Sequence, residues 1–183
     1  MEYQKLYDDI IKDLKSGKRA LMRLNSDQIE GLKKALDDGL VTEELHKILC
    51  ILDHSIESNL EFSSYICREL KKVEDSKTLI YLLGASSKHV IEAAAKDGFP
   101  PSGEFMSAIK NILESPLAKE PENLEWLLRT IEQTGMKSIF FKGSILKLKP
   151  GMGSLFNQHK KASKEIIELL EKRWAPIKGG PLG

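Results

Sequence analysis

The sequence predicts an all-α protein, either an irregular multi-helix bundle or a short right-handed superhelix of the HEAT or armadillo kind. Apolar residues recur at helical spacing along almost the whole chain. Of the 183 residues, 41% are hydrophobic and 30% are charged, which is the balance of a globular protein with a core. No segment repeats with a period of about 34 or about 40 residues, so a regular tetratricopeptide array is not expected and irregular helical repeats stay open.

Six short helices are predicted before residue 100. Each has an apolar stripe, and all but the fourth begin at a capping residue or end at a glycine. Their ranges are 3–14, 26–38, 42–56, about 61–73, 79–83 and 90–95. Gly84 is expected to end the fifth helix and Gly98 the sixth.

The segment 98–103, Gly-Phe-Pro-Pro-Ser-Gly, is the strongest break in the helical pattern. Two prolines stop a helix there, and two glycines permit unusual turns. We expect one all-helical domain over residues 1–177 with a possible subdomain boundary at 98–103, followed by a flexible tail at 178–183.

Beyond the break, the pattern predicts helices over 105–113 and 121–135 and a last helix from Ser154 to about Trp174. Trp174, at the end of an apolar stripe, is expected to be largely buried. Residues 136–153 fit either a small hairpin or two single helical turns, and turns are favoured. The residues predicted to face inward on the last helix are Leu155, Phe156, Ala162, Ile166, Ile167, Leu169 and Leu170.

Composition and charge exclude several classes of protein. The chain carries 28 Lys and Arg against 27 Asp and Glu, so a histone-like nucleic-acid coat and an acidic tail are both excluded. The start lacks the apolar run of a signal peptide, and no stretch approaches about 18 consecutive apolar residues, which predicts an intracellular protein. Cys50 and Cys67 are too few for a disulfide framework and are expected to be free thiols.

One predicted helix carries a stripe of potential metal ligands. His and Cys one turn apart could bind zinc. Because ligands at i, i+4 and i+8 span about 12 Å, one ion could touch only a neighbouring pair. We therefore predict a solvated helix face rather than a metal site. The stripe consists of Glu43, His46, Cys50, His54 and Glu57.

Nucleophilic catalysis is not predicted. A nucleophile and a base could come from Cys50, Cys67, His89 and His159, but no nucleophile elbow or Gly-rich active-site loop accompanies them. The glycines around Met152 could cradle an anion at the start of the last helix, although a tight turn with a helix cap explains them more simply.

The segment from Met136 to Lys161 contains no Asp or Glu. Its lysines alternate with Phe140, Phe141 and Phe156, as in surfaces that contact phosphates and stack on bases. The same pattern would arise if the aromatic residues were core and the lysines solvated, or if the acidic helix at 120–132 neutralised the lysines. The candidate polyanion-binding residues are Lys137, Lys142, Lys147, Lys149, Lys160 and Lys161.

The second half of the chain carries a family resemblance. Asp97-Gly98 precedes a helix that begins near Phe105, a leucine-rich helix contains Leu127 and Leu128, and the last helix ends at Trp174 before Ala-Pro-Ile. Residues 97–177 thereby resemble the N-terminal helical domain of transcription elongation factor TFIIS and the related core of Iws/Spn-type elongation factors. The resemblance implies a non-catalytic nuclear module that docks short helical or disordered peptide motifs in transcription assemblies.

The leading functional prediction is a non-catalytic helical module, without a cofactor, that binds a protein partner in a groove between helices. The alternative is binding of nucleic acid or another polyanion through residues 136–161, and the third is an enzyme or metal protein with an unrecognised site. Salt dependence separates the first two, because phosphate contacts weaken steeply with salt. The protein is expected in the nucleus if the resemblance holds and in the cytoplasm otherwise; the partner and the oligomeric state stay open.

Overall fold

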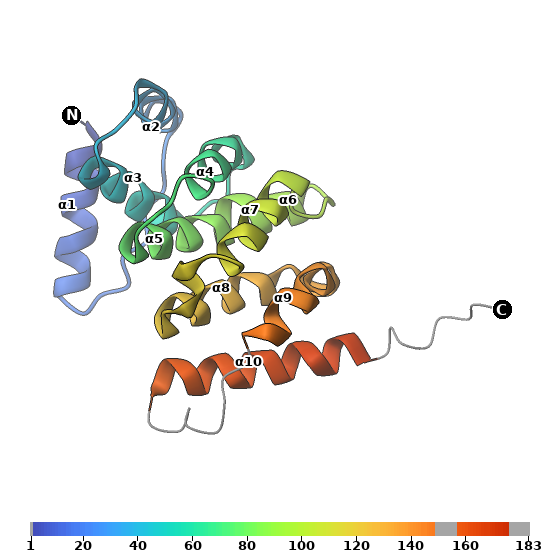
Figure 1. The fold of residues 1–183 in the computed structure, drawn as a ribbon. Helices are drawn as coiled ribbons and strands as arrows, with labels where there is room; N and C mark the ends of the chain where they lie inside the picture. Colours follow the sequence, from blue (N-terminus) through green and yellow to red (C-terminus); the bar gives the residue numbers. More distant parts are fainter. Residues whose placement is uncertain (1, 149–156, 176–183) are drawn as a thin grey trace. The chain divides into compact units, whose positions relative to one another are not determined.

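The computed structural model describes residues 2–148 and 157–175, and within these ranges the chain is helical almost throughout, with no β-strand (Figure 1). The all-α prediction is confirmed. The chain divides into two compact units, Met1–Phe99 and Pro100–Gly183, whose boundary falls within the segment 98–103. None of the described helices has the length and apolar character needed to cross a membrane.

The first unit is built around α3 (Thr42–His54), which packs against α1 (Glu2–Lys15) and α5 (Ser76–Ser86). In the segment that follows α1, Met22 pairs with the chain just after α3. Its N–H donates to the His54 carbonyl, and its carbonyl accepts from the Ile56 N–H. This pairing ends α3 at His54, two residues earlier than predicted. The remaining elements are α2 (Ser26–Asp38), η1 (Leu60–Phe62), α4 (Ser63–Leu70), η2 (Ser87–Glu92) and α6 (Ala93–Lys96).

Helix α2 begins at a complete capping box. The Asn25 side chain accepts a hydrogen bond from the Gln28 N–H, and the Gln28 side chain accepts one from the Asn25 N–H, both at 2.9 Å. The helix ends at Gly39, whose φ of 79° suits glycine. These two signals explain why the predicted range of this helix agrees with the structure.

Gly84 does not end a helix, contrary to the prediction. Helix α5 runs through it to Ser86 and continues through the π-helical segment η2 into α6. A Cβ atom at Gly84 would lie 3.1 Å from Cγ of Asp53 on α3. Glycine at this position thus lets α5 lie close to α3 rather than stopping the helix.

The second unit is built around the pairing of α8 (Pro121–Gln133) with α10 (Gln158–Trp174), the most extensive helix contact in the described chain. Ser115 caps the start of η3, and Pro121 begins α8 as a first-turn proline. The other elements are α7 (Gly103–Leu113), η3 (Pro116–Lys119), η4 (Gly135–Phe141) and α9 (Lys142–Lys147).

The favoured reading of residues 136–148 as helical turns is confirmed by η4 and α9, while 149–153 lie outside the described residues. Helix α10 begins at Gln158, because Asn157 is extended and caps it by accepting from the Lys160 N–H. The predicted start at Ser154, like Leu155, Phe156 and the tail at 178–183, falls outside the described residues.

One predicted core residue of the last helix is wrong. Leu169 is 48% exposed. The buried stripe of α10 runs through Ser163, Ile167, Leu170 and Trp174, and at 100° per residue Leu169 lies about 130° from its centre. Ala162 and Ile166 flank the stripe and are half-buried.

Candidate functional site

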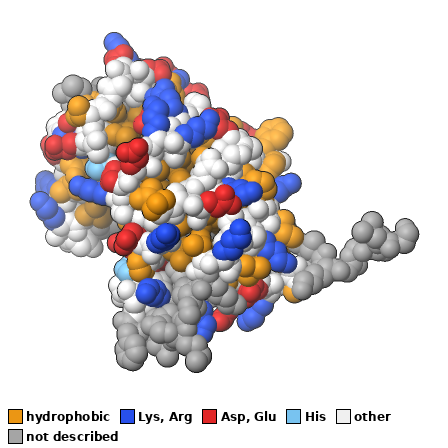
Figure 2. All heavy atoms as spheres, in the orientation of Figure 1, with side chains coloured by type: hydrophobic (Ala, Val, Ile, Leu, Met, Phe, Trp, Pro, Cys, Tyr) orange, Lys and Arg blue, Asp and Glu red, His pale blue; other side chains and the backbone are white. Residues whose placement is uncertain are grey.

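The two units carry net charges of opposite sign, which nearly cancel in the whole chain. Residues 1–99 contain 15 Lys and Arg against 18 Asp and Glu, a net charge of −3, whereas residues 100–183 contain 13 against 9, a net charge of +4. All six candidate lysines belong to the second unit. Figure 2 shows Lys and Arg side chains interspersed with hydrophobic ones on the visible face.

The structure places five of the six candidate lysines, and Lys149 lies outside the described residues. Lys137 belongs to η4, Lys142 and Lys147 belong to α9, and Lys160 and Lys161 lie in the first turns of α10. The ion pairs formed within the described part of the second unit are those of Arg129, His159, Lys164 and Arg173. No candidate lysine is neutralised by a described carboxylate.

Two carboxylates of the acidic helix α8 pair with residues other than the candidate lysines. Glu125 accepts from Arg129 at 2.6 Å and lies 2.8 Å from Nδ1 of His159, and Glu132 pairs with Arg173. Burial alone would raise the pKa of Glu125, yet hydrogen bonds from Arg129 and His159 hold it below the usual value. These two carboxylates therefore do not neutralise the candidate lysines.

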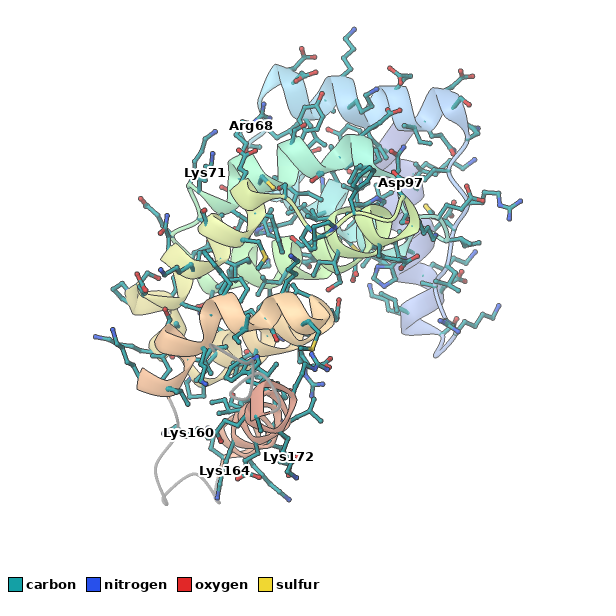
Figure 3. The ribbon with its side chains drawn as sticks, turned by 90° about the vertical axis from the view of Figure 1, so that its right-hand side faces the viewer. Arg68, Lys71, Asp97, Lys160, Lys164 and Lys172 are labelled. Atoms are coloured by element: carbon teal, nitrogen blue, oxygen red, sulfur yellow. The ribbon has the colours of Figure 1, made fainter. Side chains whose placement is uncertain are left out.

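Two candidate lysines meet at a small hollow, where a third lysine joins them. Lys119 from η3, Lys147 from α9 and Lys160 from α10 line a cavity of about 280 Å³ together with apolar residues. We call this site the lysine-rimmed hollow; its other lining residues are Ala118, Pro121, Leu124 and Leu148. Lys160 stands in the first turn of α10, where the helix dipole adds positive potential (Figure 3).

Sequence reasoning missed Lys119, because it precedes the lysine-rich segment and is separated from it by the whole of α8. Only the folding of η3 against α8 brings it to the hollow. In the sequence, Leu124 likewise has the spacing of an ordinary core residue of α8. That it lines the hollow depends on the packing of the neighbouring elements.

A lysine outside the candidate set lies beside an exposed aromatic ring of the lysine-rich segment. Phe140 is 49% exposed, and Nζ of Lys110 lies 5.4 Å from its ring centroid. Phe141 is a core residue, as the alternative interpretation of the segment held. Trp174 is also buried, and Nζ of Lys142 lies 5.9 Å from its ring centroid. Phe156 lies outside the described residues.

The predicted solvated face of α3 is wrong at Cys50, which is 5% exposed. Packing against both α1 and α5 leaves α3 too little free surface for a solvated stripe. Nε2 of His46 lies 2.7 Å from the Thr78 hydroxyl, and Nδ1 of His54 lies 2.9 Å from the Cys50 carbonyl. Within 2–148 and 157–175, no three His, Cys, Asp or Glu residues are grouped so that they could hold a metal ion.

Both cysteines should react slowly with thiol reagents. Burial raises the pKa of Cys50 to about 11, so its reactive thiolate is scarce at pH 8, and Cys67 is also buried. A chromogenic disulfide reagent should detect no rapidly reacting thiol in the folded protein and two in denaturant. Rapid reaction of one thiol in the folded state would contradict this assignment.

His89 lies beside a serine hydroxyl, but the tautomer of its neutral ring is the wrong one to accept the hydroxyl proton. Its Nδ1 accepts from the Asn59 N–H at 3.1 Å, so the neutral ring carries its proton on Nε2, which donates to the Leu52 carbonyl at 2.9 Å. The Ser55 hydroxyl, 3.2 Å from Nε2, donates to backbone carbonyls. The arrangement is that of a buried structural histidine rather than a general base.

Comparison of the chain with protein-family models, with curated proteins and with solved structures found no match. The resemblance of residues 97–177 to elongation-factor domains stays a prediction.

Proposed function

We propose that the chain is a non-catalytic helical module that binds a protein partner, and that its lysine-rimmed hollow takes an acidic peptide segment bearing an apolar side chain. The observation that carries the proposal is the convergence of Lys119, Lys147 and Lys160, from three separate elements, around an apolar floor.

The size and lining of the hollow favour a side chain over a cofactor. At about 280 Å³ it is smaller than the roughly 300–1,000 Å³ of most small-molecule sites. Ala118, Leu124 and Leu148 give the hollow an apolar lining, while its three lysines, which are exposed, add positive charge. A peptide with carboxylates on either side of one apolar residue satisfies both parts.

The chain itself provides little to neutralise the rim. Residues 136–161 contain no Asp or Glu, so the segment that contributes Lys147 and Lys160 has no carboxylate of its own. Three lysines that line one hollow make it attractive to an anionic partner. The elongation-factor resemblance, which also implies docking of peptide motifs in nuclear transcription assemblies, supports the same role.

Two matched charge reversals test the site. Lys147→Glu with Lys160→Glu should weaken binding of a labelled peptide, made of glutamates around one leucine, by about tenfold or more, because two attractive charges become repulsive. Lys137→Glu with Lys142→Glu carries the same change in charge away from the hollow's lining and should leave affinity within about twofold. Both variants should stay folded, since surface substitutions usually change stability by less than about 0.5 kcal/mol. Equal weakening by both would remove the hollow as the site.

A second candidate, nucleic-acid binding, is favoured by the exposed ring of Phe140 beside Lys110. It makes a different prediction in the same experiment. A single-stranded oligonucleotide should then bind more tightly than the peptide, lose affinity steeply with salt, and be weakened by both charge reversals and by Phe140→Ala. An oligonucleotide affinity no greater than that of the peptide, with a shallow salt dependence, would exclude this candidate.

A further inference from the structure

A larger, mostly apolar groove lies in the first unit, between α1, α2 and the turn that leads into α3. Its volume is about 580 Å³, and its walls include Tyr3 and Leu6 from α1 and Leu32 and Ala35 from α2. Val41, in the turn after α2, also lines the groove and is 71% exposed. A large exposed apolar side chain beside an apolar groove indicates an interaction surface.

Gly31 points to an occupant of this groove. It stands in the middle of α2, where glycine costs roughly 0.5–1 kcal/mol relative to alanine. Apart from its chain neighbours and the backbone of its own helix, no protein atom lies within 4 Å of the place where its Cβ would be, and its φ is not positive. The fold of the first unit therefore does not require glycine here, whereas a chain approaching the groove from outside would gain room from it.

Two unpaired charges of opposite sign border the same groove. Lys34 and Asp38 both line it, both are exposed, and neither forms an ion pair with another described residue. By contrast, the neighbouring Lys33 is paired with Glu30 and Glu61. Positions 31, 34, 35 and 38 follow the spacing i, i+3, i+4 and i+7, so they form one stripe of α2.

We propose that the occupant is a second copy of this chain, with the two α2 helices antiparallel about a two-fold axis. An axis that places Lys34 opposite Asp38 of the second copy passes near position 36. The same axis brings the end of α2 of the second copy, from which the turn to Val41 leaves, toward the part of α2 that holds Gly31, because the two helices run antiparallel. The interface then contains each ion pair and each apolar contact twice, as two-fold symmetry requires.

The expected dimer is small and reversible. Helix α2 has 13 residues, a length of about 20 Å, so one helix pair buries less than the roughly 1,200–2,000 Å² of standard interfaces. Sedimentation equilibrium of the full chain should show a shift from monomer to dimer as its concentration rises through the micromolar range. This inference concerns the first unit and goes beyond the proposed peptide binding, which depends on lysines of the second.

Reciprocal charge variants test the pairing directly. Lys34→Asp alone and Asp38→Lys alone should each be monomeric at concentrations where the parent is dimeric, since like charges would face each other twice. Mixing the two single variants should restore association as a heterodimer, and the double variant should form a homodimer again. Recovery of this kind is not expected from a structural effect within one chain. Circular dichroism of each variant checks that it is folded.

A steric pair provides an independent test. Gly31→Leu should abolish the dimer by filling the space expected to receive the end of α2 of the second copy, while Gly31→Ala, its matched control, should raise the thermal midpoint and weaken the dimer less. A parent chain that stays monomeric at all concentrations, or single variants that fail to associate when mixed, would overturn the second-copy assignment. If the parent were monomeric and bound a different protein, and Gly31→Leu abolished that binding, the groove would have a different occupant. This result would also overturn the second-copy assignment.

Discussion

Replacing Trp174 with alanine is expected to lower the free energy of unfolding of the second unit by about 3–5 kcal/mol. Trp174 is 1% exposed at the end of α10, and its indole N–H donates to the Ser138 hydroxyl at 3.0 Å. The substitution would leave a large cavity and a buried hydroxyl without its donor. Urea unfolding followed by circular dichroism measures the loss.

Trp174→Phe is the matched control, because it keeps most of the buried apolar volume and removes the indole N–H. It should cost clearly less than the alanine variant. If Trp174→Ala unfolded at the same urea concentration as the parent, Trp174 would not be the core residue that the structure shows, and the packing of α10 on η4 would be in doubt.

The second large effect concerns His89 in the first unit. His89→Leu should lower the free energy of unfolding by about 1–3 kcal/mol, because it leaves the Asn59 N–H without its partner, while the Leu52 carbonyl loses one hydrogen bond and keeps those from Ser55. His89→Gln offers a donor and an acceptor of similar reach and should cost less. Urea unfolding of the two variants beside the parent measures both losses.

His89 should also make stability depend on pH. Burial is the main cause that lowers the pKa of His89 below its ordinary 6.5, so the folded state keeps the ring neutral where the unfolded chain takes up a proton. The contribution to stability is fully present above about pH 6.5 and is lost as the pH falls through the range below it. His89→Gln should flatten this part of the stability profile, measured at several pH values. An unchanged profile in this variant would assign the dependence to another group.

The sequence predicts most helices because their signals are local. Asn25 with Gln28 and Gly39 after α2 act within one helical turn, and the predicted range 26–38 agrees with the structure. Gly84 carries the same kind of signal, but its reason is the close approach of Asp53, which is far away in the sequence. A glycine stop and a glycine needed for packing cannot be distinguished without the tertiary structure.

The candidate site was only partly predictable for the same reason. The absence of acidic residues between Met136 and Lys161 identifies a basic segment, and two of its lysines reach the hollow. The third, Lys119, arrives through the packing of η3. Arg129 pairs with Glu125 one turn away on the same helix, a spacing visible in the sequence, whereas the pairing of Arg173 with Glu132 joins residues 41 apart and depends on the fold.

The central claim is that the lysine-rimmed hollow binds an acidic peptide through an apolar side chain. Titration of the isotope-labelled full chain with the glutamate–leucine peptide, followed by amide chemical shifts, tests it most directly. We predict saturable shifts at Ala118, Leu124 and Leu148, with little change at Phe140 and its neighbours. Shifts centred on Phe140 and Lys137, or no saturable shift in the second unit, would contradict the claim.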